Sequence, residues 1–421
     1  MRIDQANLAE TDHTMQINQA FAAERAHAFY RKRAATLLID LFANSRWATR
    51  PRILAMKKRV FVCLFASCLL PCWAIPAAAQ TVVFVNPGKK DEVFWVTTSQ
   101  AMQVAADSLG IKLEVFYAER NHLYLLDILR MVAARPVRER PDYVVIGNEK
   151  RMGGAMLKIA SDAGIKVFFS NSTILPEDHA EFGRPREKYK GWIGSLLPQA
   201  QDAGYLTAKA LLARGLREKR LGADGKLHLL AIAGDRSTES SLLRNAGLER
   251  ALKEQPLAVL DQMVFADWRQ DIAEVKAREL YVRYPQAQLV WASNDLIALG
   301  AMQALEGAGG IPGKDKLFSG VNTSAKAMQA VIDGRMEALA GGHFMCGAWA
   351  LVLIYDHAHD RDFAGEGLEL VQPMFSLFSP PLAQRFLERF RDGVPKMDFR
   401  PYSKAYNPRL KHYDFSFSQL L

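Results

Sequence analysis

From Thr81 onward the sequence alternates short apolar runs with longer amphipathic segments, and this alternation leaves few folds open to the chain. Residues 81–85 form a β-branched run, and residues 95–109 have helical spacing and end at Gly110. Strands that alternate with helices imply βαβ units and a parallel sheet covered by helices on both faces. The predicted fold class is therefore α/β, with doubly wound parallel sheets.

The alternation comes in two series of similar size, separated by a Pro- and charge-rich stretch at 176–190. Two such series predict two lobes joined by a hinge, with a cleft between them. We assign residues 80–192 and about 343–372 to the first lobe, because a helix at 346–359 is expected to return there. Residues 193–342 and about 373–400 are assigned to the second lobe.

The N-terminal 79 residues do not follow this pattern. From Met56 the chain has a basic start, an almost uncharged apolar segment and a small-residue site ending at Ala79, which is typical of a secretory signal peptide. We expect cleavage after Ala79 rather than lipidation at Cys68, and export of the mature chain. Residues 1–55 precede this signal and are interpreted as an upstream extension assigned in error, with a cytoplasmic tail on a signal anchor as the alternative.

Charge and cysteine content exclude two classes of protein. Residues 1–79 contain 11 of the 54 Lys and Arg residues but only 5 of the 45 Asp and Glu residues, so the chain after cleavage would have a net charge of +3 rather than +9. This near balance gives no support for nucleic-acid binding. Of the four cysteines only Cys346 follows the predicted signal, so no disulfide framework is possible within one mature chain.

A turn between an apolar run at 289–292 and a helical pattern from 296 carries Ser293, Asn294 and Asp295. Open α/β sheets bind ligands at the carboxyl ends of their strands, where this turn lies. Such side chains also cap helices by accepting hydrogen bonds from the free amides of the first turn. We expect Asp295 to cap the helix and Asn294 to face the cleft.

Several short motifs resemble the periplasmic type 1 substrate-binding proteins of sugar ABC transporters, the family of ribose-binding protein. Residues 244–248 (Arg-Asn-Ala-Gly-Leu) are similar to the Arg-x-x-Gly-Phe signature of this family, and residues 294–300 are close to Asn-Asp-x-x-Ala-x-Gly. Residues 320–322 (Gly-Val-Asn) lie where the family often has Gly-Phe-Asp. The opening strand followed by Phe94 and Trp95 resembles its first strand and aromatic pair.

The resemblance implies which side chains touch a ligand. It points to aromatic contacts from Phe94, Trp95 and Trp268, a polar contact from Arg244, and amide contacts from Asn294 and Asn322. The family often has Asp-Arg after its fourth strand, where this chain has Asn171 and Ser172, and Asn322 replaces a usual Asp. These changes remove strong acceptors for sugar hydroxyls and argue against an ordinary pentose or hexose.

The opening residues 86–90 (Asn-Pro-Gly-Lys-Lys), followed by Phe94 and Trp95, also resemble the periplasmic receptor for autoinducer-2, which has this fold and works with a membrane sensor kinase.

The residue types themselves suit binding. Indole faces pack on the C–H surface of a sugar, amides offer donors and acceptors together, and the fork of Arg244 holds two oxygens at once. Glu92, before the aromatic pair, and His343, after a Gly-Gly step, are further candidates for the cleft. For each aromatic residue the alternative is core packing.

Catalytic and DNA-binding classes find little support. The sequence has no Gly-x-Ser-x-Gly, Walker A or His-Glu-x-x-His motif, and His357 and His359 are interpreted as a solvated helix face rather than a metal site. A repressor of this fold would need a helix-turn-helix before the first strand, where an export signal stands instead. We therefore expect neither enzyme activity nor a metal or cofactor, with a periplasmic hydrolase as the remaining enzyme alternative.

These observations predict a periplasmic solute-binding protein that closes by hinge motion on a small polar, sugar-like ligand. The expected partner is an ABC permease, and the alternative is a membrane sensor kinase or cyclase for which the protein is the sensing subunit. We expect a monomer when free. The aromatic tail at 401–421 is predicted either to wrap its own lobe or to form an interaction surface.

Overall fold

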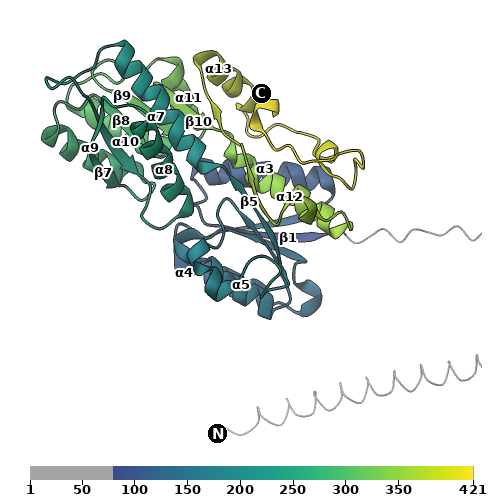
Figure 1. Ribbon diagram of the computed structural model, residues 1–421. Helices are drawn as coiled ribbons and strands as arrows, with labels where there is room; N and C mark the ends of the chain where they lie inside the picture. Colours follow the sequence, from purple (N-terminus) through teal and green to yellow (C-terminus); the bar gives the residue numbers. More distant parts are fainter. Residues whose placement is uncertain (1–78, 421) are drawn as a thin grey trace, which may run out of the picture. The chain divides into compact units, whose positions relative to one another are not determined.

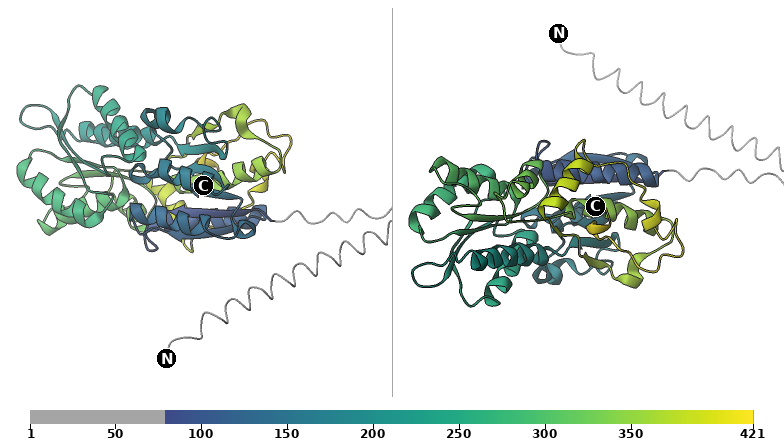
Figure 2. Two further views of the ribbon diagram at one scale, coloured as in Figure 1. Left: turned by 90° about the horizontal axis from the view of Figure 1, so that it is seen from below. Right: turned by 90° about the horizontal axis from the view of Figure 1, so that it is seen from above.

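The computed structural model describes residues 79–420, which form two α/β lobes (Figures 1 and 2). The predicted extension (1–55) and all of the predicted signal peptide except Ala79 lie outside the described residues. Within residues 79–420 no helix has the length and apolar character needed to cross a membrane.

The first lobe is built on a parallel six-stranded sheet with the order β11-β5-β4-β3-β1-β2. Its strands are β1 (Thr81–Asn86), β2 (Lys112–Tyr117), β3 (Tyr143–Ile146), β4 (Lys166–Ser170), β5 (Trp192–Pro198) and β11 (Glu369–Gln372). Its helices are α3 (Val93–Leu109), α4 (His122–Ala133), α5 (Gly153–Asp162), α6 (His179–Phe182) and α12 (Cys346–Ala358). Helices α4 and α5 pack together on one face of this sheet, and α3 and α12 pack together on the other.

The second lobe repeats this plan with the order β12-β10-β9-β8-β6-β7, in which only β12 is antiparallel to its neighbour. Its strands are β6 (Leu227–Ala233), β7 (Ala258–Phe265), β8 (Leu289–Ala292), β9 (Leu317–Val321), β10 (Ala338–Gly341) and β12 (Ser376–Leu377). Its helices are α7 (Ala200–Arg217), α8 (Glu239–Lys253), α9 (Gln270–Arg283), α10 (Asp295–Gly307), α11 (Ala325–Ile332) and α13 (Pro380–Phe390). The predicted pair of doubly wound lobes is thus confirmed.

Short 3-10 turns occur between these elements, at η2 (Val137–Glu139), η3 (Glu149–Arg151), η4 (Pro176–Asp178), η5 (His343–Met345), η6 (Phe363–Glu366), η7 (Arg400–Tyr402) and η8 (Phe417–Leu420).

The strand order reverses at the same place in each lobe, between β1 and β3 in the first and between β6 and β8 in the second. Ligands of open α/β sheets bind beyond the carboxyl ends of the strands at such a reversal. The central strands are buried along almost their whole length, as β1 is from Val82 to Asn86. This follows from helices covering both faces of a parallel sheet.

Three short segments connect the two sheets and the helices that cover them. The chain passes from β5 to α7 through Gln199, from β10 to α12 through Gly342, and from β11 to β12 through residues 373–375. The predicted lobe boundary at 192/193 is therefore wrong, because β5 pairs with β4 in the first sheet and the crossing follows Pro198. The sequence pattern did not mark β5, since it directly follows a charged stretch.

The C-terminal segment contacts both lobes. Helix α13 packs on α11 of the second lobe, whereas residues 399–415 pack on α3 and α12 of the first. The ring of Phe415 stacks on Trp349 at 5.0 Å, and the side chains of Phe415, Phe417 and Leu420 are buried. These buried residues of the tail thus pack into the body of the protein, and the tail extends beyond one lobe.

Asp356 of α12 is the centre of this contact. It is fully buried and accepts hydrogen bonds from the hydroxyls of Ser403 and Tyr413 and from the amides of Lys404 and Ala405. Its neighbour His357 bonds through Nδ1 to the hydroxyl of Tyr143 at 3.0 Å. The predicted solvated helix face is therefore wrong at His357, which the sheet partly covers, whereas His359 is exposed.

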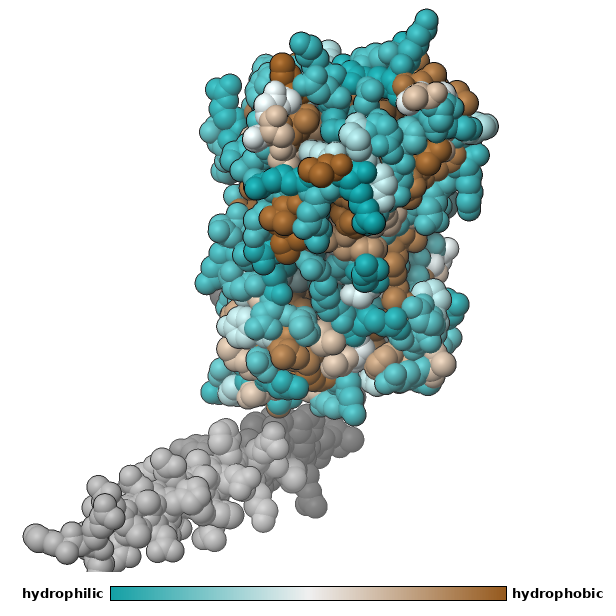
Figure 3. All heavy atoms as spheres, turned by 90° about the vertical axis from the view of Figure 1, so that its left-hand side faces the viewer, coloured by the Kyte–Doolittle hydropathy of each residue, from teal (hydrophilic) through white to brown (hydrophobic). Residues whose placement is uncertain are grey.

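One end of the molecule is shown in Figure 3, from the side of the second lobe. Hydrophilic residues cover most of this face, and hydrophobic side chains form small separate groups. Scattered groups of this kind are normal for the surface of a globular protein.

Candidate ligand-binding site

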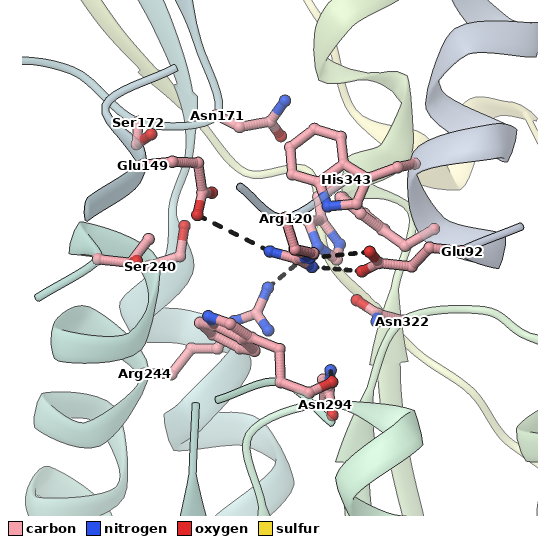
Figure 4. A pocket seen from close by; sticks show the side chains of 14 residues that line it. Glu92, Arg120, Glu149, Asn171, Ser172, Ser240, Arg244, Asn294, Asn322 and His343 are labelled. Atoms are coloured by element: carbon pink, nitrogen blue, oxygen red, sulfur yellow. Dashed lines mark hydrogen bonds and ion pairs between the residues drawn. The ribbon is translucent and has the colours of Figure 1, made fainter. Parts of the chain in front are cut away.

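A pocket lies between the two lobes at the carboxyl ends of their strands, with a volume of about 490 Å³ that includes space open to solvent. Fourteen residues line it: Glu92, Phe94, Trp95, Arg120, Glu149, Asn171, Ser172, Thr238, Ser240, Arg244, Trp268, Asn294, Asn322 and His343 (Figure 4). All ten residues predicted for the site are among them.

Trp95 of α3 supplies an indole face from the first lobe. Asn86, at the end of β1, fixes the turn that leads to it by bonding through Nδ2 to the carbonyl of Trp95 at 3.1 Å and through Oδ1 to the amide of Gly88 at 2.8 Å. Gly88 lies directly against the indole, where an added Cβ would approach ring atoms to 2.2 Å. Phe94 meets Trp95 edge-on at 5.0 Å.

Trp268 supplies the opposing indole from the second lobe and also rests on a glycine. A Cβ on Gly234 would come within 2.4 Å of its ring. The indole Nε1 donates to Asp235 Oδ2 at 2.6 Å, which orients the ring. Burial acts to raise the pKa of Asp235, but hydrogen bonds from Thr238, Ser237 and Trp268 outweigh it and lower the pKa.

Arg244 of α8 is 4% exposed and reaches the pocket from the second lobe. Its Nη1 donates to the carbonyl of Ser293 at 2.7 Å and its Nη2 to His343 Nε2 at 3.0 Å. The guanidinium also lies 5.5 Å from the centroid of the Trp268 ring and 5.8 Å from that of Phe375. Burial lowers the pKa of Arg244 to about 10, so the side chain still carries its charge at neutral pH.

His343 lies in the segment that connects β10 to α12. Its ring lies between those of Phe94 and Phe375, with centroid distances of 4.7 Å and 4.5 Å. Burial and the neighbouring charge of Arg244 hold the pKa of His343 well below its ordinary value. The imidazole is therefore neutral. Because a guanidinium only donates, His343 Nε2 accepts and Nδ1 carries the ring proton.

The amides stand at the ends of three strands. Asn171 follows β4 and Asn322 follows β9, both at positive φ (68° and 101°), a conformation that asparagine tolerates better than most residues. Asn294 follows β8, where its Oδ1 accepts from the amide of Ile297 at 2.8 Å and its Nδ2 donates to the carbonyl of Trp268 at 3.4 Å.

Asn294 lines the pocket as predicted, but the prediction that Asp295 caps the helix is wrong. Asn294 both caps α10 and lines the pocket. The buried Asp295 accepts hydrogen bonds from Asn322 Nδ2 at 2.8 Å and from the amide of Ser324 at 3.1 Å. Asp295 therefore holds Asn322 in place, because the first helical position directs its side chain toward the next strand end.

Arg120 and Glu149 line the pocket but were not predicted from the sequence. Arg120 Nε donates to Glu92 Oε2 at 2.8 Å, and Glu149 lies 3.8 Å from the guanidinium on its other side (Figure 4). Burial acts to lower the pKa of Arg120, but the ion pair with Glu92 outweighs it and raises the pKa. Burial also raises the pKa of Glu149, and Arg120 offsets this only in part.

Thr238, the N-cap of α8, and Ser240, in the first turn of that helix, complete the lining. They, Arg120 and Glu149 all follow the carboxyl end of a strand, the signal that located Asn294. Applying the same rule to every strand would have identified the loops that carry them, although not which side chains turn into the pocket.

Two lobes joined by three short crossings around a pocket at their strand ends define a hinged ligand-binding protein. The chain belongs to the periplasmic binding protein family, since residues 82–361 match its domain. It is similar to the ribose import binding protein RbsB of Escherichia coli (strain K12), at 25% identity over 62% of this chain and 79% of that protein.

Solved structures agree with this assignment. A periplasmic sugar-binding protein from Pseudomonas fluorescens has 37% identity and a TM-score of 0.71, covering 80% of this chain and 97% of that one. The arabinofuranose-bound binding protein of the arabinose ABC transporter from Shewanella sp. ANA-3 has 19% identity and a TM-score of 0.60, covering 74% and 96%. The second likeness concerns the fold alone.

Proposed function

We propose that this protein captures a small polar, sugar-like ligand in the periplasm by hinge closure and delivers it to an ABC permease. The observation that carries the proposal is the pairing of Trp95 and Trp268, indoles from opposite lobes that line one pocket together with three amides. Indole faces and amides are the groups that bind the C–H and O–H surfaces of a sugar.

The relatives support the same ligand class. The Pseudomonas fluorescens protein is described as a periplasmic sugar-binding protein and the Escherichia coli protein as a ribose import binding protein. Periplasmic location and a cleaved signal peptide are part of the proposal, and N-terminal sequencing of the exported protein tests them. A mature chain that begins before Met56 would contradict the signal peptide.

Closure brings charged and polar groups of the first lobe into contact with those of the second. Lys150 Nζ of the first lobe lies 3.2 Å from Asp267 Oδ1 of the second, and the amide of Thr173 donates to Glu239 Oε2 at 3.0 Å across the same gap. A ligand that contacts both lobes stabilises this closed arrangement over an open one. The chemistry expected is capture and release, with the sugar unchanged.

A thermal-shift screen of pentoses, hexoses, furanosyl sugars and sugar acids tests the proposal. We expect at least one compound to raise the unfolding temperature and to change tryptophan fluorescence, because Trp95 and Trp268 line the pocket. Trp95→Ala should abolish that response, whereas Trp192→Phe, a buried change in β5, should keep it.

Product analysis after incubation with each sugar tests the enzyme alternative, which turnover of the sugar would favour.

The partner is tested by adding the ligand-loaded protein to vesicles that contain a candidate permease and its ATPase. Stimulated ATP hydrolysis and uptake of the ligand would support delivery. Ligand-dependent control of a sensor kinase or cyclase, without uptake, would instead favour a sensing subunit. Sedimentation of the free protein tests the expected monomer.

A further inference from the structure

The charges in the pocket do not balance at Arg244. Arg120 has Glu92 and Glu149 as ion-pair partners, and Lys150 has Asp235 and Asp267. Arg244 makes no ion pair with any carboxylate in the part of the chain that the structure describes, and its partners are a carbonyl and a neutral imidazole.

The nearest acidic group does not supply the missing charge. Asp295 acts on Arg244 only through space, and its own carboxylate is occupied by Asn322, Ser324 and the amide of Leu296. Burial raises the pKa of Asp295, which disfavours its charged form further. A buried cation without a counter-charge is costly unless a ligand provides one.

The unpaired hydrogen-bonding groups around Arg244 are mostly donors, which also favours a ligand that supplies acceptors. Within residues 79–420, four buried polar atoms of the pocket-lining residues have no hydrogen-bond partner: the donors Arg244 Nε, His343 Nδ1 and Trp95 Nε1, and the acceptor Asn171 Oδ1. His343 Nδ1 belongs with the donors because its Nε2 accepts from Arg244. Three donors against one acceptor call for a ligand rich in acceptor oxygens.

We propose that the ligand is a monoanionic sugar derivative, a sugar acid, whose carboxylate is bound by Arg244. This inference rests on the proposed sugar-binding function and adds the charge of the ligand. Arg244 uses two of its five N–H groups within the protein, so a planar carboxylate can accept from the others in a bidentate manner. A single cation without an ion-pair partner matches one negative charge better than the two of a phosphate monoester.

Matched pairs of neutral sugars and sugar acids test the proposal by isothermal titration calorimetry. Suitable pairs, which differ only at C6 and keep the sugar ring, are galactose with galacturonate and glucose with glucuronate. We expect the acid of at least one pair to bind at least about tenfold more tightly than its neutral partner, the gain typical of a charge-assisted hydrogen bond. The methyl ester of that acid, which keeps the shape and loses the charge, should lose the gain.

Substitutions on helix α8 test whether Arg244 causes the preference for the acid. Arg244→Gln should abolish the preference for the acid, and Arg244→Lys, which keeps the charge without the fork, should retain part of it. Arg250→Gln on the exposed face of α8 is the matched control and should retain all of it. If Arg244→Gln does not fold, the comparison of acid with methyl ester on the unchanged protein still decides.

The outcomes separate the two proposals. A neutral sugar that binds more tightly than its acid in every pair would overturn the anionic ligand and leave the sugar-binding function intact. An acid preference that survives Arg244→Gln would overturn the role of Arg244. Failure of every sugar, neutral or acidic, to bind would overturn the sugar-binding function together with the inference built on it.

Discussion

At the scale of single residues, the two indoles of the pocket are positioned by glycines. Gly88 lies under Trp95 and Gly234 under Trp268, at distances that leave no room for a methyl group. Each ring can thus lie flat against the backbone of a strand-to-helix turn. Alanine has no conformational penalty at either position, since neither glycine has a positive φ, so the constraint is contact alone.

Gly234→Ala should displace Trp268 and lower the affinity for the sugar that binds best. The shift required exceeds about 1 Å at the ring, and misplacement of this size costs on the order of tenfold or more in binding. Titration calorimetry measures the change. Gly307→Ala, at the end of α10 where a methyl group meets nothing within 4 Å, is the control and should leave affinity unchanged. Equal affinities for both variants would show that the contact between Gly234 and the Trp268 ring does not affect ligand binding.

Glu239, which accepts from Thr173 across the gap between the lobes, should make stability depend on pH. Burial raises the pKa of Glu239 to about 7, far above its value in an unfolded chain. The folded protein therefore retains a proton that the unfolded chain releases near pH ~4.3, so the contribution of Glu239 to stability falls as the pH rises from ~4.5 to ~7.

The measurement is the unfolding temperature of wild type and of Glu239→Gln between pH 5 and 8. Glu149 acts in the same direction, because burial raises its pKa too, and the difference between the two proteins isolates Glu239. We expect wild type to lose ~1–3 °C more than the variant across this range. Parallel curves would mean that Glu239 ionises normally.

Pocket-lining residues were predictable from the sequence where a strand end carries a tryptophan or an asparagine within a recognisable motif. Trp268 and Asn322 stand out in the sequence by residue type and motif, and both lie in the pocket. Arg120 follows a residue that also has positive φ, at 54° for Glu119 and 60° for itself. Such a backbone path decides that Arg120 turns inward, and no periodicity of the sequence encodes it.

At the scale of elements, the tail is attached to α12 through one carboxylate. Each oxygen of Asp356 accepts two hydrogen bonds from the segment 403–413, so four donors of the tail converge on one buried side chain. These four hydrogen bonds replace those that the carboxylate would make to water in an unfolded chain. The path of the tail could not be predicted, because its aromatic pattern fits burial on either lobe and it uses both.

Asp356→Asn should therefore destabilise the protein. The amide presents hydrogens where the carboxylate oxygen accepted from two donors, which leaves buried donors unpaired at a cost of ~2–4 kcal/mol. Chemical denaturation measures the loss. Asp360→Asn, an exposed position two residues beyond α12, is the control and should change stability by less than ~0.5 kcal/mol. Similar values for both variants would show that the tail is held by its aromatic contacts alone.

At the scale of the whole molecule, a small number of cross-lobe contacts favours closure. Lys150, at positive φ in η3, reaches both Asp235 and Asp267 of the second lobe, and it is 40% exposed in its side chain. Exposed ion pairs contribute only ~0.2–1 kcal/mol. In the proposed hinge closure, these contacts of the protein itself contribute little, and the ligand supplies most of the stabilisation.

Lys150→Met should lower affinity by about 1.5- to 5-fold, the equivalent of such an ion pair, and reduce the dependence of affinity on salt. Titrations at low and at high salt measure both effects. Lys158→Met on the exposed face of α5 should behave as wild type. Affinity that does not differ between the two variants would exclude Lys150 from closure.

The central claim is that a sugar-like ligand is held between the lobes, with Arg244 on one side and Trp95 on the other. A crystal structure with the tightest-binding compound of the sugar screen tests it most directly. The account predicts that the ligand lies in the pocket, contacts both lobes and accepts hydrogen bonds from Arg244. A ligand bound elsewhere on the surface, or touching one lobe without Arg244, would contradict it.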